Sequence, residues 1–232
     1  MDKIIDLHIH TNKSDGALSP KEVVEEAIKN RVSAIAIADH DTIDAYTDEL
    51  FDYAESNNVI LIPAVEISTK IKKCGIHVLG YNFDLNDQNF REKLEKFRNI
   101  RHDYLNDVSK KLEELGYKVN VEELDKIEAV TKAHISLDVI SNKDNEEILD
   151  LIKEMKVDAI EGNYLYVDRN NVMHDDTDKW NTFAKENNLI STIGSDFHNK
   201  DGLRPEIGFR NTDFTISREE ISSILRYLSN NE

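Results

Sequence analysis

Short apolar segments alternate with amphipathic helical segments along this chain, and this alternation is the feature that most constrains its fold. The segment Ala34–Ala38 is apolar throughout, which is typical of a strand buried in a parallel sheet. Before it, residues 20–30 carry apolar side chains on one helical face. Ser19 and Glu22 have the spacing of a capping box, which predicts where this helix begins. Repeated units of this kind imply a parallel sheet with right-handed crossovers, and hence an α/β fold.

Closing seven or eight such units would give a TIM-like barrel whose strands all end at one mouth. We expect strands near residues 4–11, 34–38, 59–65, 76–81, 129–133, 158–161, 189–193 and 207–209. We expect helices near residues 20–30, 43–57, 145–155 and 178–187 and after Ser217, with an irregular stretch over 162–178. Residues 85–125 are charged and have helical periodicity, which predicts a helical insertion. The chain has no linker, so 1–232 is expected to form a single barrel domain.

Composition excludes several classes of partner. The net charge is −17, from 46 acidic and 29 basic residues, which argues against a stable nucleic-acid complex. The single cysteine, Cys74, excludes an internal disulfide and is typical of a reducing cytoplasm. No apolar stretch approaches the roughly 18 residues of a membrane span, and no signal peptide is evident. We therefore expect a cytoplasmic protein with a small-molecule substrate and no membrane partner, whose oligomeric state stays open.

Histidines and carboxylates stand at the ends of the predicted strands. His8 and His10 are two residues apart at the end of the first strand, so their side chains point the same way. Asp15 follows on the next turn, and in a barrel the residues at other strand ends would face the same mouth. The set has nine members: His8, His10, Asp15, His40, Glu66, His77, His134, Asp196 and His198.

Nine nitrogen and oxygen donors exceed the roughly four that one zinc ion needs, so the set predicts two or three divalent metal ions. Glu66 is the candidate to bridge two of them. Each residue taken alone has the ordinary alternative of a satisfied core or surface side chain. Nine of them at strand ends favour a shared metal site.

Four segments resemble, in order, the motifs of the PHP (polymerase and histidinol phosphatase) superfamily. Asp6–Thr11 with Ser14–Gly16 is similar to the first motif, and Ala38–Thr42 to the second. Ala133–His134 is similar to the third, and Gly194–His198 to the fourth. Within the superfamily, the chain most resembles the small metal-dependent phosphoesterases of the TrpH/YciV type.

The resemblance implies a distorted (β/α)7 barrel with a trinuclear site filled by manganese, zinc or iron. Carried over by position, it implies three ligand sets: His8, His10, Glu66 and Asp196 for the first metal; Asp15, His40 and His198 for the second; Glu66, His77 and His134 for the third. Ile135 follows His134 where the third motif usually continues with proline. It therefore stays open whether His134 is the histidine of that motif.

Five further residues are candidates for catalysis or phosphate contact. Asp39 stands beside His40 and is a candidate to orient that imidazole, because metal-bound histidines usually donate their other N–H to a carboxylate or carbonyl. Arg101, Lys132 and Arg204 are candidates for a phosphate clamp, and His174 for substrate contact or leaving-group protonation. An ordinary surface role is the alternative for each clamp residue, and an ordinary loop role for His174.

The expected reaction is hydrolysis of a small phosphomonoester, such as a nucleoside phosphate, a nucleoside 3′,5′-bisphosphate or a short oligonucleotide. Two metals about 3.5–4 Å apart lower the pKa of a bridging water and stabilise the attacked phosphoryl group. The chain has neither a Gly-x-Ser-x-Gly elbow nor a P-loop. Three alternatives remain: a histidinol-phosphate phosphatase, an amidohydrolase, and a non-catalytic metal-binding module.

Overall fold

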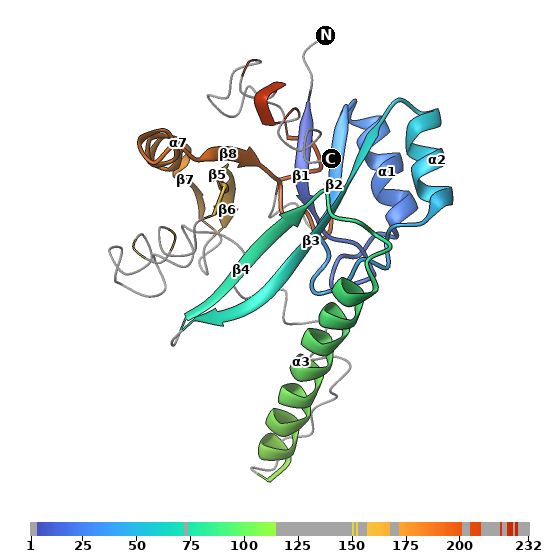
Figure 1. The fold of residues 1–232 in the computed structure, drawn as a ribbon, viewed down its shortest axis with the longest axis vertical. Helices are drawn as coiled ribbons and strands as arrows, with labels where there is room; N and C mark the ends of the chain where they lie inside the picture. Colours follow the sequence, from blue (N-terminus) through green and yellow to red (C-terminus); the bar gives the residue numbers. More distant parts are fainter. Residues whose placement is uncertain are drawn as a thin grey trace.

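The computed structural model describes residues 4–71, 74–114, 157–167, 172–200 and 205–209, together with residues 150, 152, 219, 222–224 and 226. The strands are β1 (Ile5–Ile9), β2 (Ala34–Ile37), β3 (Ile60–Ile71), β4 (Cys74–Tyr81), β5 (Ala159–Asn163), β6 (Leu165–Val167), β7 (Met173–Asp175) and β8 (Ile190–Ile193). The helices are α1 (Pro20–Lys29), α2 (Asp48–Ser56), α3 (Gln88–Glu114) and α7 (Thr177–Glu186) (Figure 1). Among the helices so described, none is both long and apolar enough to cross a membrane.

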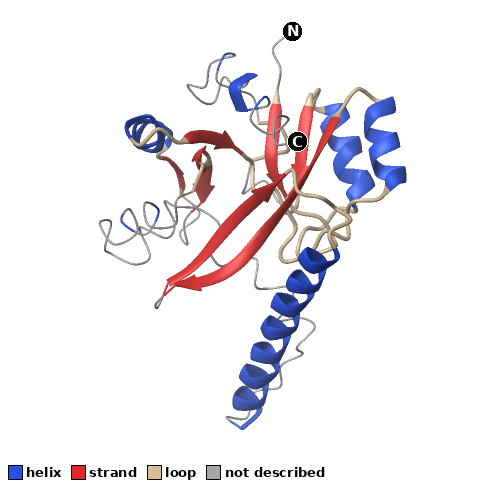
Figure 2. Cartoon of the chain, in the orientation of Figure 1, coloured by secondary structure: helices blue, strands red, loops and turns tan. Residues whose placement is uncertain are grey.

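The main sheet has the strand order β1-β2-β3-β4. β1, β2 and β3 pair in parallel, so their carboxyl ends meet at one edge. β4 turns back and pairs antiparallel with the second half of β3, and the two form a long ribbon (Figure 2). α1 and α2 lie on one side of this sheet, and α3 extends away from it (Figure 1). The predicted α/β class is confirmed.

A second parallel pair, β5 with β8, lies next to β1. The link runs through the residues after β8, where the backbone N–H of His10 donates to the carbonyl of Phe197 at 2.9 Å. β6 and β7 form a separate antiparallel pair. The strand predicted over 129–133 lies outside the described residues, so closure into a (β/α)7 barrel stays a prediction.

Side chains of β2 alternate between two apolar layers. Ile35 and Ile37 belong to the layer that packs against α1 and α2, whereas Ala34, Ala36 and Ala38 belong to the layer on the other face. Successive strand residues point to opposite faces, so this alternation follows directly from the sequence. The larger side chains therefore face the helices.

Two predictions differ from the structure because of local capping and turn chemistry. The helix expected from residue 43 begins at Asp48, because the Thr47 side chain caps it by accepting a hydrogen bond from the N–H of Leu50. The strand expected over 207–209 is wrong. Gly208 there lies in a turn with φ +70°, a conformation that favours glycine.

Two other predictions fail because of pairings that a single segment does not reveal. β3 does not end at Glu66 but continues to Ile71, where β4 supplies its partner. The stretch 162–178, expected to be irregular, contains β6 and β7. Within the predicted helical insertion over 85–125, α3 spans 88–114, and residues 115–125 lie outside the described residues.

The hydroxyl of Tyr46 completes the hydrogen bonding between β2 and β3. Pro63 is the register partner of Ile37 and has no N–H to donate. The Tyr46 hydroxyl lies 2.6 Å from the carbonyl of Ile37 and 2.8 Å from that of Ile62, and it accepts from the N–H of Ile37 and of Ala64 at 3.0 and 2.8 Å. The ring is 8% exposed, so these groups have no ready access to water.

We expect Tyr46→Phe to lower the free energy of unfolding by roughly 1–3 kcal/mol, because buried backbone groups lose their partner. Urea titration followed by circular dichroism measures the change. Tyr53→Phe is the matched control, since its hydroxyl donates to the exposed Glu25 at 3.5 Å, and we expect a change within about 0.5 kcal/mol. Equal stabilities of the two variants would contradict the role of Tyr46.

Candidate metal centre

Eight of the nine predicted ligands lie together near the carboxyl ends of β1, β2 and β8 and on the β3–β4 ribbon. The eight are His8, His10, Asp15, His40, Glu66, His77, Asp196 and His198. The ninth, His134, lies outside the described residues. The arrangement follows from the fold, because parallel strands deliver their carboxyl ends to one edge.

Glu66 and His77 reach this edge in a way that differs from the prediction. They do not stand at strand ends but lie within β3 and β4. In the antiparallel register, His77 is opposite Ser68, two residues after Glu66. The ribbon therefore brings the two side chains together, with His77 Nδ1 2.9 Å from Glu66 Oε1.

His8, His10, Glu66 and Asp196 form the first group of donors. Glu66 Oε2 lies 3.2 Å from His8 Nε2 and 3.1 Å from His10 Nε2. Asp196 Oδ1 lies 3.4 Å from His10 Nε2 and 3.6 Å from His8 Nε2. None of the four residues is more than 4% exposed. Two carboxylates therefore meet the same two imidazoles in a site shielded from water.

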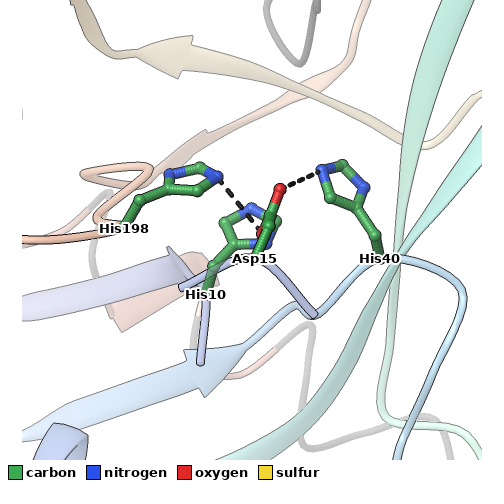
Figure 3. A group of neighbouring side chains, drawn as sticks. All are labelled: His10, Asp15, His40 and His198. Atoms are coloured by element: carbon green, nitrogen blue, oxygen red, sulfur yellow. Dashed lines mark ion pairs between the residues drawn. The ribbon is translucent and has the colours of Figure 1, made fainter. Parts of the chain in front are cut away.

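Asp15 is the centre of a second group, in which three imidazoles surround one carboxylate (Figure 3). Its Oδ1 lies 3.2 Å from His10 Nδ1 and 3.4 Å from His198 Nε2. Its Oδ2 lies 3.4 Å from His40 Nε2. The rings of His10 and His198 are stacked, with centroids 4.2 Å apart.

His40, Glu66 and His77 form a third group. Glu66 Oε2 lies 3.4 Å from His40 Nδ1, while its Oε1 faces His77. Glu66 is thus shared by the first and third groups, and His40 by the second and third. Such sharing is what a ligand that bridges two metal ions requires.

Burial and neighbouring charges shift the pKa values of the donor groups strongly. Burial by itself lowers the pKa of His8, but the carboxylates of Glu161 and Glu66 outweigh this and raise it well above the usual value. Burial raises the pKa of Glu66, but the rings of His40 and His8 hold it well below the usual range. For His40 burial dominates and lowers the pKa to about 3, so this ring stays in the neutral form that binds metals.

The donor atoms fit divalent metal ions. Within the described part of the chain, buried His10 Nδ1 and Asp15 Oδ2 make no hydrogen bond, whereas buried polar atoms normally do. The donor atoms of each group lie within 4.8 Å of one another: His10, Asp15, His40 and His198; His8, His10 and Glu66; His40, Glu66 and His77. Mixed imidazole and carboxylate donors suit zinc, manganese and iron.

Asp39 holds the turn that carries Asp15. Its Oδ1 accepts hydrogen bonds from the N–H of Thr11 at 2.7 Å and the hydroxyl of Ser14 at 2.6 Å. Its Oδ2 accepts from the hydroxyl of Thr11 at 2.6 Å. The sequence predicted that Asp39 would orient His40, but its carboxylate instead fixes the loop after β1.

The other predicted catalytic residues are less completely described. His174 lies in β7 and stacks on Tyr166, with ring centroids 4.9 Å apart. Arg101 is part of α3. Lys132 and Arg204 lie outside the described residues. The roles of these four residues stay predictions.

Two buried carboxylates at the site were missed. Glu161 Oε1 lies 2.9 Å from His8 Nδ1, on the side of the ring away from Glu66. Asp6 accepts hydrogen bonds from the N–H groups of Ser195 and Gly208, both at 2.9 Å, and burial raises its pKa. Glu161 carried the same signal as the predicted ligands, since it ends a predicted strand. Asp6 gave no such signal within its apolar segment.

An open pocket of about 260 Å³ lies between the residues after His40 and the first turns of α3. Asp41 and Thr42 line it on one side, and Arg91 and Arg98 line it on the other. Arg98 and Asp44 both line the pocket and pair at 3.3 Å. None of the eight described donor residues lines this pocket; Asp41, the residue after His40, connects it to them along the chain.

Three relatives of known description match parts of the chain. The 5′-3′ exoribonuclease of Haemophilus influenzae is 40% identical over 116 residues, which are 50% of this chain and 42% of that protein. The 5′-3′ exoribonuclease Rnm of Escherichia coli is 32% identical over 155 residues, 65% of this chain and 53% of that protein. The 3′,5′-nucleoside bisphosphate phosphatase of Chromobacterium violaceum is 29% identical over 112 residues, 48% of this chain and 39% of that protein. This chain spans about half the length of the relatives that it matches.

Solved structures share the fold. An amidohydrolase from Chromobacterium violaceum, with bound sulfate and no metal, has a TM-score of 0.69 and 19% identity, covering 88% of this chain and 90% of that chain. A Bifidobacterium adolescentis protein, provisionally described as a metal-dependent phosphoesterase, has a TM-score of 0.65 and 20% identity, covering 96% of both chains. A family model for the PHP domain matches residues 6–229, and the chain therefore belongs to the PHP domain family.

Proposed function

We propose that this protein is a metal-dependent phosphoesterase that hydrolyses a small phosphomonoester. The observation that carries the proposal is the run of three adjacent donor groups linked through Glu66 and His40. The family and the nucleotide-directed relatives support it, because two of those relatives are exoribonucleases and one is a nucleoside bisphosphate phosphatase. Candidate substrates are a nucleoside phosphate, a nucleoside 3′,5′-bisphosphate and a short oligonucleotide.

Three sets of side chains would hold manganese, zinc or iron ions. As the resemblance of the sequence to the family implies, they are His8, His10, Glu66 and Asp196; Asp15, His40 and His198; and Glu66 and His77 with His134. Bound ions of this kind polarise a phosphoryl oxygen and lower the pKa of bound water. We propose that three ions bind, one to each set.

The chain's own residues prepare the site in two ways. Burial of His10 and Glu66 excludes water and strengthens every electrostatic interaction there. Asp39 fixes the loop through Thr11 and Ser14, so the second group does not depend on a mobile turn. Preorganised groups of this kind lose little free energy to reorganisation during the reaction.

We propose substrate contacts from the pocket and from the residues that the sequence singles out. The 260 Å³ pocket beside Asp41 would receive the part of the substrate that leaves with the ester oxygen. Arg101, Lys132 and Arg204 are candidates to clamp the phosphate, and His174 to contact the substrate or protonate the leaving group.

The net charge of −17 favours a short substrate over a long polymer, and the single cysteine favours a cytoplasmic enzyme. We also propose that residues 1–232 form a single closed (β/α)7 barrel domain.

Release of phosphate from a panel of substrates tests the function. The full chain is stripped of metal, reloaded with manganese, zinc or iron, and assayed on p-nitrophenyl phosphate, a nucleoside 3′,5′-bisphosphate, a short oligoribonucleotide and histidinol phosphate. We expect metal-dependent release that is highest on a nucleotide and is lost in His10→Ala. A preference for histidinol phosphate would favour the histidinol-phosphate phosphatase, and amide cleavage without phosphate release would favour an amidohydrolase. Metal binding without turnover of any substrate would leave a non-catalytic module.

A further inference from the structure

β5 contacts the first donor group through the side chain of Glu161. Glu161 is the third residue of β5, and its side chain is 6% exposed. Its Oε1 lies 2.9 Å from Nδ1 of His8, the ring nitrogen that faces away from Glu66. The other nitrogen, Nε2, faces His10 and Glu66 at 3.1 and 3.2 Å. One imidazole therefore joins a carboxylate outside the predicted ligand set to the centre of the donor group.

A glycine makes room for this pair. A Cβ added at Gly194 would overlap the Cβ of His8 and press against Oε1 of Glu161. Gly194 directly follows β8, which pairs with β5 in parallel. The absence of a side chain at this position lets His8 and Glu161 pack at hydrogen-bond distance.

Tyr164, one residue beyond β5, makes a similar contact with a second predicted ligand. Its hydroxyl donates to Oδ2 of Asp196 at 3.3 Å, while Oδ1 of Asp196 faces His8 and His10. Tyr164 is 8% exposed and its ring is stacked on that of Tyr166. Asp196 has φ +52°, a left-handed conformation that aspartate adopts more often than most residues, and the tyrosine hydroxyl contacts the carboxylate oxygen of its side chain that does not face His8 and His10.

We propose that Glu161 and Tyr164 are positioning residues of the metal centre, which hold His8 and Asp196 by the atoms that face away from the metal. The proposal rests on the proposed metal site. A hydrogen bond from Nδ1–H of His8 to Glu161 fixes the tautomer in which the lone pair of Nε2 points at the donor group. A hydrogen bond to Oδ2 of Asp196 leaves Oδ1 as the ligand atom. Neither positioning residue has to touch the metal or the substrate.

Manganese affinity of the metal-free full chain, measured by titration calorimetry, tests the proposal. We expect Glu161→Ala to weaken binding by about 10–100-fold, the usual effect of removing a group that orients a metal ligand. Glu161→Gln keeps an acceptor for His8 and should recover part of the affinity. We expect Tyr164→Phe to weaken binding by a smaller factor, because Asp196 keeps its charge.

Tyr166→Phe is the matched control. It removes the hydroxyl of the neighbouring stacked ring, and this hydroxyl donates to Asp176, which is not a predicted ligand, at 3.4 Å, so manganese affinity should not change. In the zinc-loaded protein, proton NMR should show the Nδ1 proton of His8 far downfield and slow to exchange in the wild type, because Glu161 accepts its hydrogen bond. In Glu161→Ala this proton should move upfield and exchange faster with water. A variant that only lost stability would keep the wild-type chemical shift in its folded form.

Two results would overturn the proposal: wild-type manganese affinity in both Glu161→Ala and Tyr164→Phe, or a metal-loaded crystal structure with Glu161 bound directly to an ion. The outcome is separate from that of the proposed function. If the variants change manganese affinity as expected but the protein releases phosphate from no ester, the proposed phosphoesterase activity would be wrong, and the positioning role of Glu161 and Tyr164 would stand.

Discussion

Substitution of Glu66 by glutamine is expected to reduce metal-dependent phosphate release by at least about 10³-fold. Glu66 Oε2 lies 3.1 Å from His10 Nε2 and Oε1 lies 2.9 Å from His77 Nδ1, so one carboxylate serves two donor groups. Glutamine keeps the size of the side chain, but it has no charge and replaces one acceptor oxygen with a donor. Loss of a metal ion costs several kcal/mol of transition-state stabilisation, and each 1.4 kcal/mol or so corresponds to a tenfold change in rate. Steady-state release of phosphate at saturating manganese measures the effect.

The same substitution on the surface is the control for this experiment. Glu55 is exposed on α2, so Glu55→Gln should keep wild-type activity. Circular dichroism of Glu66→Gln should show the wild-type spectrum, which separates lost chemistry from lost folding. If Glu66→Gln kept more than about a tenth of the wild-type rate, Glu66 would not be a shared ligand and the proposed centre would be wrong.

The part of the site that could be predicted follows from strand geometry. His8 and His10 are two residues apart, and β1 pairs in parallel with β2, so His10 and His40 had to reach the same edge. Asp196 and His198 follow the last strand by the same rule. Periodicity along the chain was sufficient for these residues, because a parallel sheet converts position in a strand into position in space.

Glu66 and His77 show where that rule stops. A carboxylate after an apolar segment was interpreted as the end of a strand, because charged residues are seldom buried. In the structure Glu66 is 0% exposed, since the surrounding histidines take the place of water. The continuation of β3 depends on pairing with β4, and this pairing is a tertiary contact that the segment itself does not encode.

Glu161 and Asp39 show that the sequence does not reveal which side chain a buried carboxylate contacts. Sequence identified Asp39 as a partner of the site but assigned it to His40, whereas its hydrogen bonds go to Thr11 and Ser14. Glu161 was placed at a strand end but was not connected to His8, from which it is 153 residues distant in sequence. Residue type and strand position predict that a carboxylate lies near the edge. Which side chain it contacts depends on how the two sheets pack.

Removal of the metal ions is expected to lower the melting temperature as well as the activity. Each ion that binds only the folded chain stabilises it by about 2.7 kcal/mol at a free concentration of 100 times the dissociation constant. For a domain of this size each kcal/mol shifts the melting temperature by about 2–4 °C, so chelation should lower it by roughly 5–10 °C for each ion removed. Without ions, His10 Nδ1 and Asp15 Oδ2 are buried and make no hydrogen bond, which lowers the stability of the folded chain. Calorimetry of the chelator-treated and manganese-loaded protein measures the difference.

The concentration dependence and the choice of ion make this prediction specific. Above the dissociation constant, the melting temperature should rise with the logarithm of the manganese concentration, as binding to the folded state requires. Calcium prefers sites made of oxygen atoms alone, so at equal concentration it should shift the melting temperature much less at a centre with five described histidines. Glu66→Gln should show a smaller shift with manganese than the wild type, because two donor groups lose a ligand. If manganese and calcium gave equal shifts, or if chelation changed nothing, the histidine and carboxylate groups would not form a metal centre.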